Sequence, residues 1–161
     1  MTITQKYNVL LICLESLAFV LVHILFSTKN RMPFLRSTEL RSEVHAYLTG
    51  TLRCLDCDPL QLGGVEDHVH ILCGLSKRIP PAELVKNLKT GSTRLLQVKG
   101  HDDFSWQTGY GAFSVSESAR ESVFSYIAQQ EMHHRRMSFQ DEFRAILNKH
   151  GVRFEERYLW E

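Results

Sequence analysis

Two histidines one residue apart, His68 and His70, are the first residues whose types and spacing suggest chemistry. They lie in DHVHILCGL, which alternates polar with apolar residues before it becomes apolar and so predicts a strand over Asp67–Leu75. Side chains alternate faces along a strand, so both imidazoles should project from the face opposite Val69. Two such imidazoles can bind one divalent cation. A pair of half-exposed strand histidines explains the same pattern, so this pair alone does not establish a metal site.

A tyrosine and a glutamine four residues apart, Tyr126 and Gln130, form the second candidate group. On one helix, this spacing puts the phenol and the amide on the same face. A phenol can attack a DNA phosphodiester and store the bond energy in a phosphotyrosine link, while a metal ion polarises the phosphate. Packing of Tyr126 on a sheet is the structural alternative. His133, three residues beyond Gln130, competes with it as a third metal ligand.

The elements that must position these residues follow from hydrophobic periodicity and from capping and turn residues. Strands are predicted over Phe19–Ser27, Leu60–Val65, Asp67–Leu75 and Gly111–Val115; helices are predicted from a cap at Ser37 or Thr38 to Leu55, over Pro81–Lys99, from a cap at Ser116 or Ser118 to about Arg136, and over Gln140–His150. This order matches a ferredoxin-like or RRM-like α+β sandwich, in which helices pack on one face of an antiparallel sheet. The fold class alone does not decide function.

Composition bounds the protein class. The 161 residues fit one domain, and a net charge of +1 argues against a protein that coats nucleic acid through bulk electrostatics. Among the four cysteines, Cys54 and Cys57 form the one C-x-x-C pair, so a four-thiolate zinc site is poorly supported. We expect reduced thiols and a cytoplasmic protein.

The apolar stretch Asn8–Phe26 raises the question of a membrane span or a signal peptide. It contains Glu15 and His23 and lacks a small-residue cleavage pattern, so we expect neither a secretory signal nor a membrane partner. Its second half is the predicted first strand. We therefore divide the chain into an N-terminal extension of unknown role, 1–20, and a domain over 21–161.

Several motifs agree in order and spacing with one family. The strand DHVHIL, the helix SYIAQQEMHH, the segment WQTGYGAFSVS and the ending ERYLWE resemble the single-tyrosine HUH transposases of bacterial insertion sequences, including their REP-associated relatives. The resemblance extends from HILFSTKNR, at about His23, to Glu161.

This resemblance implies a site and a reaction. His68 and His70 would be the metal ligands, Gln130 would complete the site with Mg²⁺ or Mn²⁺, and Tyr126 would form a 5′-phosphotyrosine intermediate with single-stranded DNA. Family members act as homodimers on DNA hairpins near element ends and can donate the tyrosine helix to the partner subunit's metal site. The N-terminal extension departs from the family pattern.

Basic and aromatic residues provide candidate DNA contacts. The basic candidates are Lys29, Arg31, Lys77, Arg78, Lys86, Lys89, Arg94, Arg135 and Arg136, of which Lys29, Arg31, Lys89 and Arg94 are the predicted DNA-binding residues. We expect only a minority to contact phosphate. Trp106, Tyr110 and Phe113 can stack on unpaired bases or pack in the core.

Three alternatives remain. A histidine-triad nucleotide hydrolase would need a third histidine at the position of Leu72. An RRM-like binding module, or a domesticated REP-associated protein that binds hairpins with little transposition, has no chemical need for a metal pair facing a tyrosine. A relaxase or replication initiator usually has a longer chain with extra domains.

Overall fold

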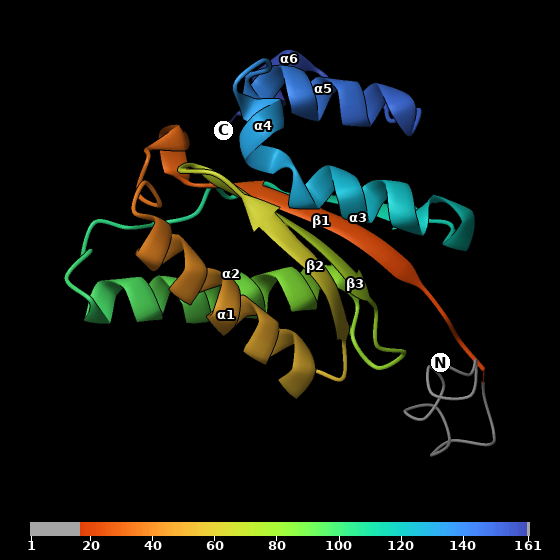
Figure 1. Cartoon of the computed structure of the whole chain (residues 1–161), viewed down its shortest axis with the longest axis horizontal. Helices are drawn as coiled ribbons and strands as arrows, with labels where there is room; N and C mark the ends of the chain where they lie inside the picture. The colour runs from red at the N-terminus through yellow and green to blue at the C-terminus, as the bar shows by residue number, and fades with distance from the viewer. Residues whose placement is uncertain (1–16, 161) are drawn as a thin grey trace.

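A four-stranded antiparallel sheet in the order β2-β3-β1-β4 forms the centre of the computed structural model, which describes residues 17–160 (Figure 1). The strands are β1 (Leu21–Ser27), β2 (Asp58–Gly64), β3 (His68–Gly74) and β4 (Gly111–Val115). The helices are α1 (Thr38–Cys54), α2 (Pro81–Val98), α3 (Arg120–Ala128), α4 (Gln130–His134), α5 (Phe139–Lys149) and α6 (Glu156–Leu159), with two 3-10 turns, η2 (Lys29–Arg31) and η3 (Glu117–Ala119). This is the predicted ferredoxin-like α+β order.

Helices α1 and α2 cover one face of the sheet, as expected (Figure 1). Alternate residues of β1, Val22, Ile24 and Phe26, point into this layer and are buried with apolar residues of both helices. Helical positions four apart, such as Leu48 and Leu52 of α1, provide the apolar stripe that faces the sheet. This layer is the main hydrophobic core.

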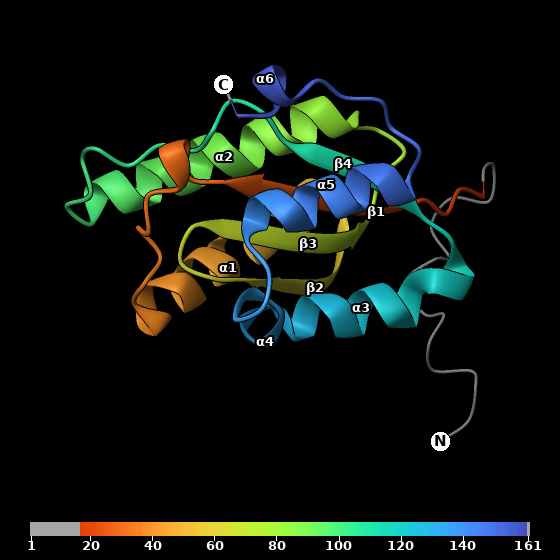
Figure 2. The ribbon, with the colours of Figure 1, turned by 90° about the horizontal axis from the view of Figure 1, so that it is seen from above.

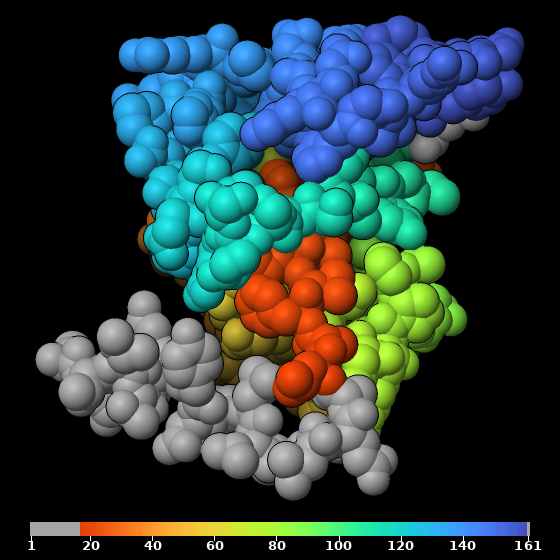
Figure 3. Space-filling model, turned by 90° about the vertical axis from the view of Figure 1, so that its right-hand side faces the viewer, coloured from red at the N-terminus to blue at the C-terminus, as the bar shows by residue number. Residues whose placement is uncertain are grey.

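The C-terminal helices add a layer on the opposite face, which Figure 2 shows with α5 lying across the sheet. Leu25 of β1 and Phe113 of β4 form a second core cluster there with Phe139 and Leu147 of α5. In the space-filling view, α3 and α5 lie next to one another, and atoms of the first strand are visible between them (Figure 3). Strand β1 lies between the two layers, and its alternate residues point into one layer or the other. All seven of its residues are therefore buried.

Capping residues and a proline mark the starts of the long helices. The Ser37 hydroxyl accepts a hydrogen bond from the Leu40 amide at the start of α1, and Pro81 is at the first turn of α2. Ser138 likewise accepts from Asp141 at the start of α5. Strand β2 begins two residues before the predicted position, with a register irregularity between Pro59 and Gln61.

The prediction of one continuous helix to about Arg136 is wrong. Helix α3 ends at Ala128, and Gln129 leaves the helical region with φ −104° and ψ 19° before α4 begins. The surrounding residues include no glycine or proline, so local sequence does not signal the break. Tertiary contacts explain it, because the turn carries the Gln130 side chain into the interior, where it is 1% exposed and hydrogen-bonded.

Further expectations concern a membrane span, the N-terminal stretch and the cysteines. No helix in residues 17–160 is long and apolar enough to span a bilayer. The unexplained half of the N-terminal stretch, with Cys13, lies outside the described residues. The three described cysteines carry free thiols, with Cys57 and Cys73 buried.

Candidate active site

His68 and His70 lie on the face of β3 that is covered by the C-terminal helices. They pair with Ser27 and Leu25 of β1, and directly paired residues share a face of an antiparallel sheet. Both imidazoles are fully buried, at 0% exposure. The alternation of the strand therefore brings both rings to one point, as the sequence pattern predicted.

Each imidazole has a hydrogen-bond partner at Nδ1. Nδ1 of His68 lies 2.7 Å from Oδ1 of Asp67, and Nδ1 of His70 lies 2.9 Å from Nε2 of His23. Because a carboxylate only accepts, Asp67 requires the hydrogen on Nδ1 of His68. Nε2 of His68 is the ring nitrogen that faces Gln130 and Glu142.

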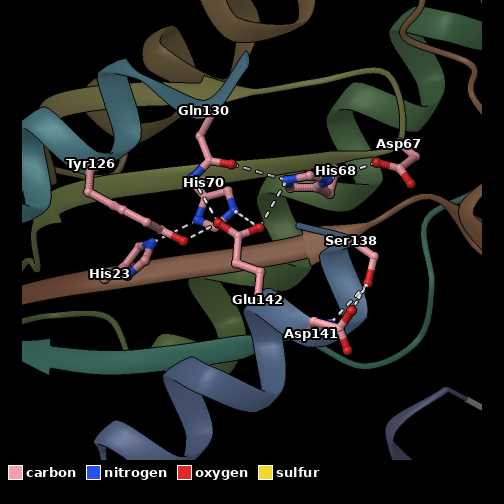
Figure 4. Close-up of polar contacts among 9 residues, drawn as sticks. All are labelled: His23, Asp67, His68, His70, Tyr126, Gln130, Ser138, Asp141 and Glu142. Carbon is pink, nitrogen blue, oxygen red and sulfur yellow. Dashed lines mark hydrogen bonds and ion pairs between the residues drawn. The ribbon is translucent and has the colours of Figure 1, made fainter. Parts of the chain in front are cut away.

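Glu142 of α5 joins the tyrosine and the glutamine at this point (Figure 4). Its Oε1 accepts hydrogen bonds from the Tyr126 hydroxyl and, at 2.9 Å, from Nε2 of Gln130. The second bond orients the Gln130 amide, so that its Oε1 faces Nε2 of His68 at 3.3 Å. Glu142 is 4% exposed, although α5 is otherwise rich in exposed polar residues.

Nitrogen and oxygen atoms of four side chains therefore converge. Oε2 of Glu142 lies 3.6 Å from Nε2 of His68 and 3.5 Å from Nε2 of His70, and both Glu142 Oε2 and His70 Nε2 are buried without a hydrogen-bond partner. Oε1 of Gln130 faces the same space. Buried polar atoms without partners are rare and call for an explanation.

A divalent cation bound here would give these atoms a partner. Ligand atoms that each lie ~2.1 Å from one ion are about 3.0–3.6 Å apart for angles of about 90–120°, and the observed separations of 3.3–3.6 Å fall in that range. His68, His70 and Glu142 also form a group that can bind a metal ion by the spacing of their ligand atoms. The residues present thus fit a cation.

Burial sets the protonation of the site. It lowers the pKa of His70, and it raises the pKa of Tyr126 above its usual value, where the hydrogen bond to Glu142 acts in the same direction. Burial also opposes ionisation of Glu142, but the neighbouring His70 and the hydrogen bonds from Tyr126 and Gln130 outweigh it and lower the pKa of that carboxyl. At neutral pH the site contains a carboxylate beside a neutral phenol.

Comparison with known protein families identifies the family of this chain. Residues 17–130 match the family described as IS200-like transposases, and this span includes the histidine pair, the tyrosine and the glutamine. The chain belongs to this family. The predicted family resemblance is therefore confirmed, whereas Glu142 lies beyond the matched residues. No curated protein matches the chain.

Two solved structures share the fold of this transposase. A candidate transposase from Deinococcus radiodurans R1 superposes with a TM-score of 0.58 at 22% identity, over 72% of this chain and 94% of that one. A REP-associated tyrosine transposase bound to a REP hairpin gives a TM-score of 0.57 at 13% identity, over 74% of this chain and 72% of that one. The α+β fold class is thereby confirmed.

The four candidate DNA-binding residues of this transposase come from η2 and α2. Lys29 is exposed in η2, and the guanidinium of Arg31 lies 5.9 Å from the Trp160 ring centroid. Arg94 is exposed on α2, the layer on the opposite side of the sheet from the histidines. Lys89 donates three hydrogen bonds to the backbone carbonyls of residues 107–109.

The three aromatic candidates separate in the same way. Trp106 is buried and donates from Nε1 to the Ser92 hydroxyl, and Phe113 is buried against the His150 ring. Tyr110, by contrast, is 40% exposed. Packing accounts for the first two, and only Tyr110 presents a ring to solvent.

His133, the competing ligand, packs its ring against Tyr126 with centroids 4.9 Å apart. Its neighbour His134 instead lies against His68 at 4.5 Å and forms a second group of ligand atoms with Asp67 and His68.

Sequence reasoning missed two residues of the site, Glu142 and His23. Glu142 lies four residues after the Ser138 cap, in a turn whose acidic residues are ordinarily exposed. His23 gave a clearer signal, because a histidine inside the apolar run LVHILF must be buried and hydrogen-bonded. Its partner depends on the pairing of β1 with β3, which no local pattern specifies.

Proposed function

We propose that this chain is a single-tyrosine HUH transposase that cleaves and rejoins single-stranded DNA at hairpin-marked ends through a 5′-phosphotyrosine intermediate. The proposal is supported most strongly by the convergence of four electron-pair donors, from His68, His70, Gln130 and Glu142, beside the Tyr126 hydroxyl. A divalent ion, Mg²⁺ or Mn²⁺, would be bound by these residues. When bound, it would neutralise charge on the scissile phosphate.

The phenol must lose its proton as it attacks, because it is neutral at the pH of the cell. The bond between the Tyr126 oxygen and phosphorus forms while the bond from phosphorus to the 3′ oxygen of the preceding nucleotide breaks. Oε1 of Glu142 already accepts the phenolic hydrogen and is therefore placed to take the proton. The departing 3′ oxygen takes a proton from solvent.

Access to this site is restricted. Both histidines and Gln130 are almost completely buried, and the ring of Phe139 at the start of α5 lies 4.6 Å from the His68 ring. Tyr126 is only half-buried. We infer that a phosphate reaches the donors from the tyrosine side or after α5 moves.

The proposal is tested with a fluorescent, hairpin-bearing single-stranded DNA incubated with the protein and Mn²⁺, then run on a denaturing gel. Wild-type protein should form a covalent adduct, and Tyr126→Phe should form none while it retains hairpin binding. Tyr110→Phe is the matched control, because it removes the hydroxyl of a half-exposed tyrosine and should leave the adduct intact. An adduct that persists in Tyr126→Phe would assign the nucleophile elsewhere.

A domesticated hairpin-binding protein with little transposition activity is the second candidate. It is favoured by the shared fold of the REP-associated transposase whose structure contains a REP hairpin. Hairpin binding by wild-type protein without any adduct, in the presence of Mn²⁺ or Mg²⁺, would select this function.

A further inference from the structure

We propose that His23 is a positioning residue that accepts the Nδ1 hydrogen of His70 and thereby holds the Nε2 lone pair of His70 toward the cation. The inference rests on the proposed metal-dependent function and assigns a role to a residue outside the His68 and His70 pair.

The geometry is specific to this pair. His23 lies on β1 opposite Leu72, so it is the diagonal neighbour of His70 on the same face of the sheet. Nε2 of His23 and Nδ1 of His70 are 2.9 Å apart, and the two rings stack at 28° with centroids 5.2 Å apart. His23 is 5% exposed, so water competes little for this bond.

The position of the hydrogen between the two nitrogens decides whether Nε2 of His70 can bind a metal ion. If His23 donates, neutral His70 carries its own hydrogen on Nε2, which then points toward Glu142 Oε2 at 3.5 Å and blocks the ligand position. If His70 donates, its Nε2 is a free lone pair and His23 carries its hydrogen on Nδ1. Only the second arrangement is compatible with a cation bound by both histidines.

Burial makes His23 suitable as the acceptor. Its ring is 5% exposed, and its Nε2 faces Nδ1 of His70 at 2.9 Å, where an acceptor needs a lone pair on that nitrogen. A charged ring would have no lone pair to offer.

The two ligand histidines are thus supported differently. His68 donates to the carboxylate of Asp67, which can only accept, whereas His70 relies on a neutral ring that can exist in either tautomer. Partners of this kind orient metal-binding histidines, and their loss typically costs about 10–100-fold in metal affinity.

The first test compares Mn²⁺ affinity in His23→Leu and His23→Gln, measured by calorimetric titration of full-length protein. Leucine fills the buried site without an acceptor, so the Kd should weaken about 10–100-fold. The glutamine carbonyl can accept the Nδ1 hydrogen, so His23→Gln should remain within about threefold of wild type. Ser114→Ala, an exposed position on the neighbouring strand β4, is the control and should not change the Kd.

The second test does not depend on any variant folding. Long-range ¹H–¹⁵N NMR of Mg²⁺-saturated wild-type protein should show the hydrogen of both His70 and His23 on Nδ1. A hydrogen on Nε2 of His23, or equal Mn²⁺ affinity in wild type and His23→Leu, would overturn the inference alone. Wild-type protein that binds no Mn²⁺ would overturn the metal-dependent function as well, which distinguishes the two failures.

Discussion

The hydroxyl of Tyr126 donates a hydrogen bond to Oε1 of Glu142, a residue 16 positions later in the chain and on a different helix. The other carboxylate oxygen, Oε2, faces the Nε2 atoms of His68 and His70. One carboxylate therefore connects the candidate nucleophile with the candidate metal ligands. Its two oxygens contact different groups, so a change at Glu142 should affect both groups.

Replacement of Glu142 with Gln should impair metal binding and cleavage together. The amide preserves the size of the side chain but removes the negative charge that faces the cation, so we expect Mn²⁺ affinity and adduct yield to fall by at least about tenfold. In thermal unfolding, Mn²⁺ should raise the midpoint of wild-type protein and have much less effect on Glu142→Gln.

The same substitution should lower the pKa of Tyr126, because the Glu142 carboxylate is one of the groups that hold it above its usual value. An ultraviolet titration with Tyr126→Phe as reference measures this change. Asp141→Asn removes an exposed carboxylate from the same turn of α5 and should leave both properties unchanged. Wild-type metal affinity in Glu142→Gln would remove the carboxylate from the proposed ligand set.

Tyr126 lies beside histidines of its own chain, which predicts a cis reaction. The ring centroids of Tyr126 and His70 are 6.0 Å apart within one chain. A co-expressed mixture of Tyr126→Phe and His68→Ala chains should therefore yield no more adduct than either variant alone, since neither chain has a complete site.

Different tags on the two chains allow any adduct to be assigned by its size, and dilution of wild-type protein to the same chain concentration provides the control. An adduct on the His68→Ala chain would show that the tyrosine acts on the partner's histidines, in a homodimer that shares its sites.

A matched pair of glycines tests how α3 is positioned. A Cβ at Gly63 of β2 would collide with the carbonyl oxygen of Ile127, the residue next to Tyr126, whereas a Cβ at Gly50 of α1 meets nothing within 4 Å. Gly63→Ala should cost about 1–3 kcal/mol of unfolding free energy and reduce adduct yield. Gly50→Ala should gain about 0.5–1 kcal/mol, because it sits in a helix interior.

Urea unfolding of both variants measures these changes. Wild-type stability and activity in Gly63→Ala would show that the contact between β2 and α3 does not set the position of the tyrosine.

The sequence predicted the parts of the site that follow from local periodicity. Alternation within β3 was enough to place His68 and His70 on one face, and the order of elements indicated the sheet. The contribution of Glu142 could not be predicted, because its burial depends on how α5 docks. The break at Gln129 has the same origin, since a buried amide rather than a glycine or proline ends the helix. Residues brought in by tertiary contacts were therefore the ones that sequence patterns missed.

Salt dependence of DNA binding should separate Lys89 from Arg94, although both were candidates for phosphate contacts. The Lys89 ammonium has three donors, and the carbonyls of residues 107–109 accept all three at 2.7–3.1 Å. Lys89→Met should therefore destabilise the protein by about 1–3 kcal/mol and leave the slope of log K against log salt unchanged.

Arg94 is exposed, so Arg94→Met should not alter stability, and it should reduce the slope by about one only if its guanidinium contacts a phosphate. Both predictions are tested by measuring hairpin binding from about 50 to about 200 mM salt, a range over which phosphate contacts strongly change affinity. A reduced slope in Lys89→Met with unchanged stability would mean that Lys89 leaves the carbonyls to bind DNA.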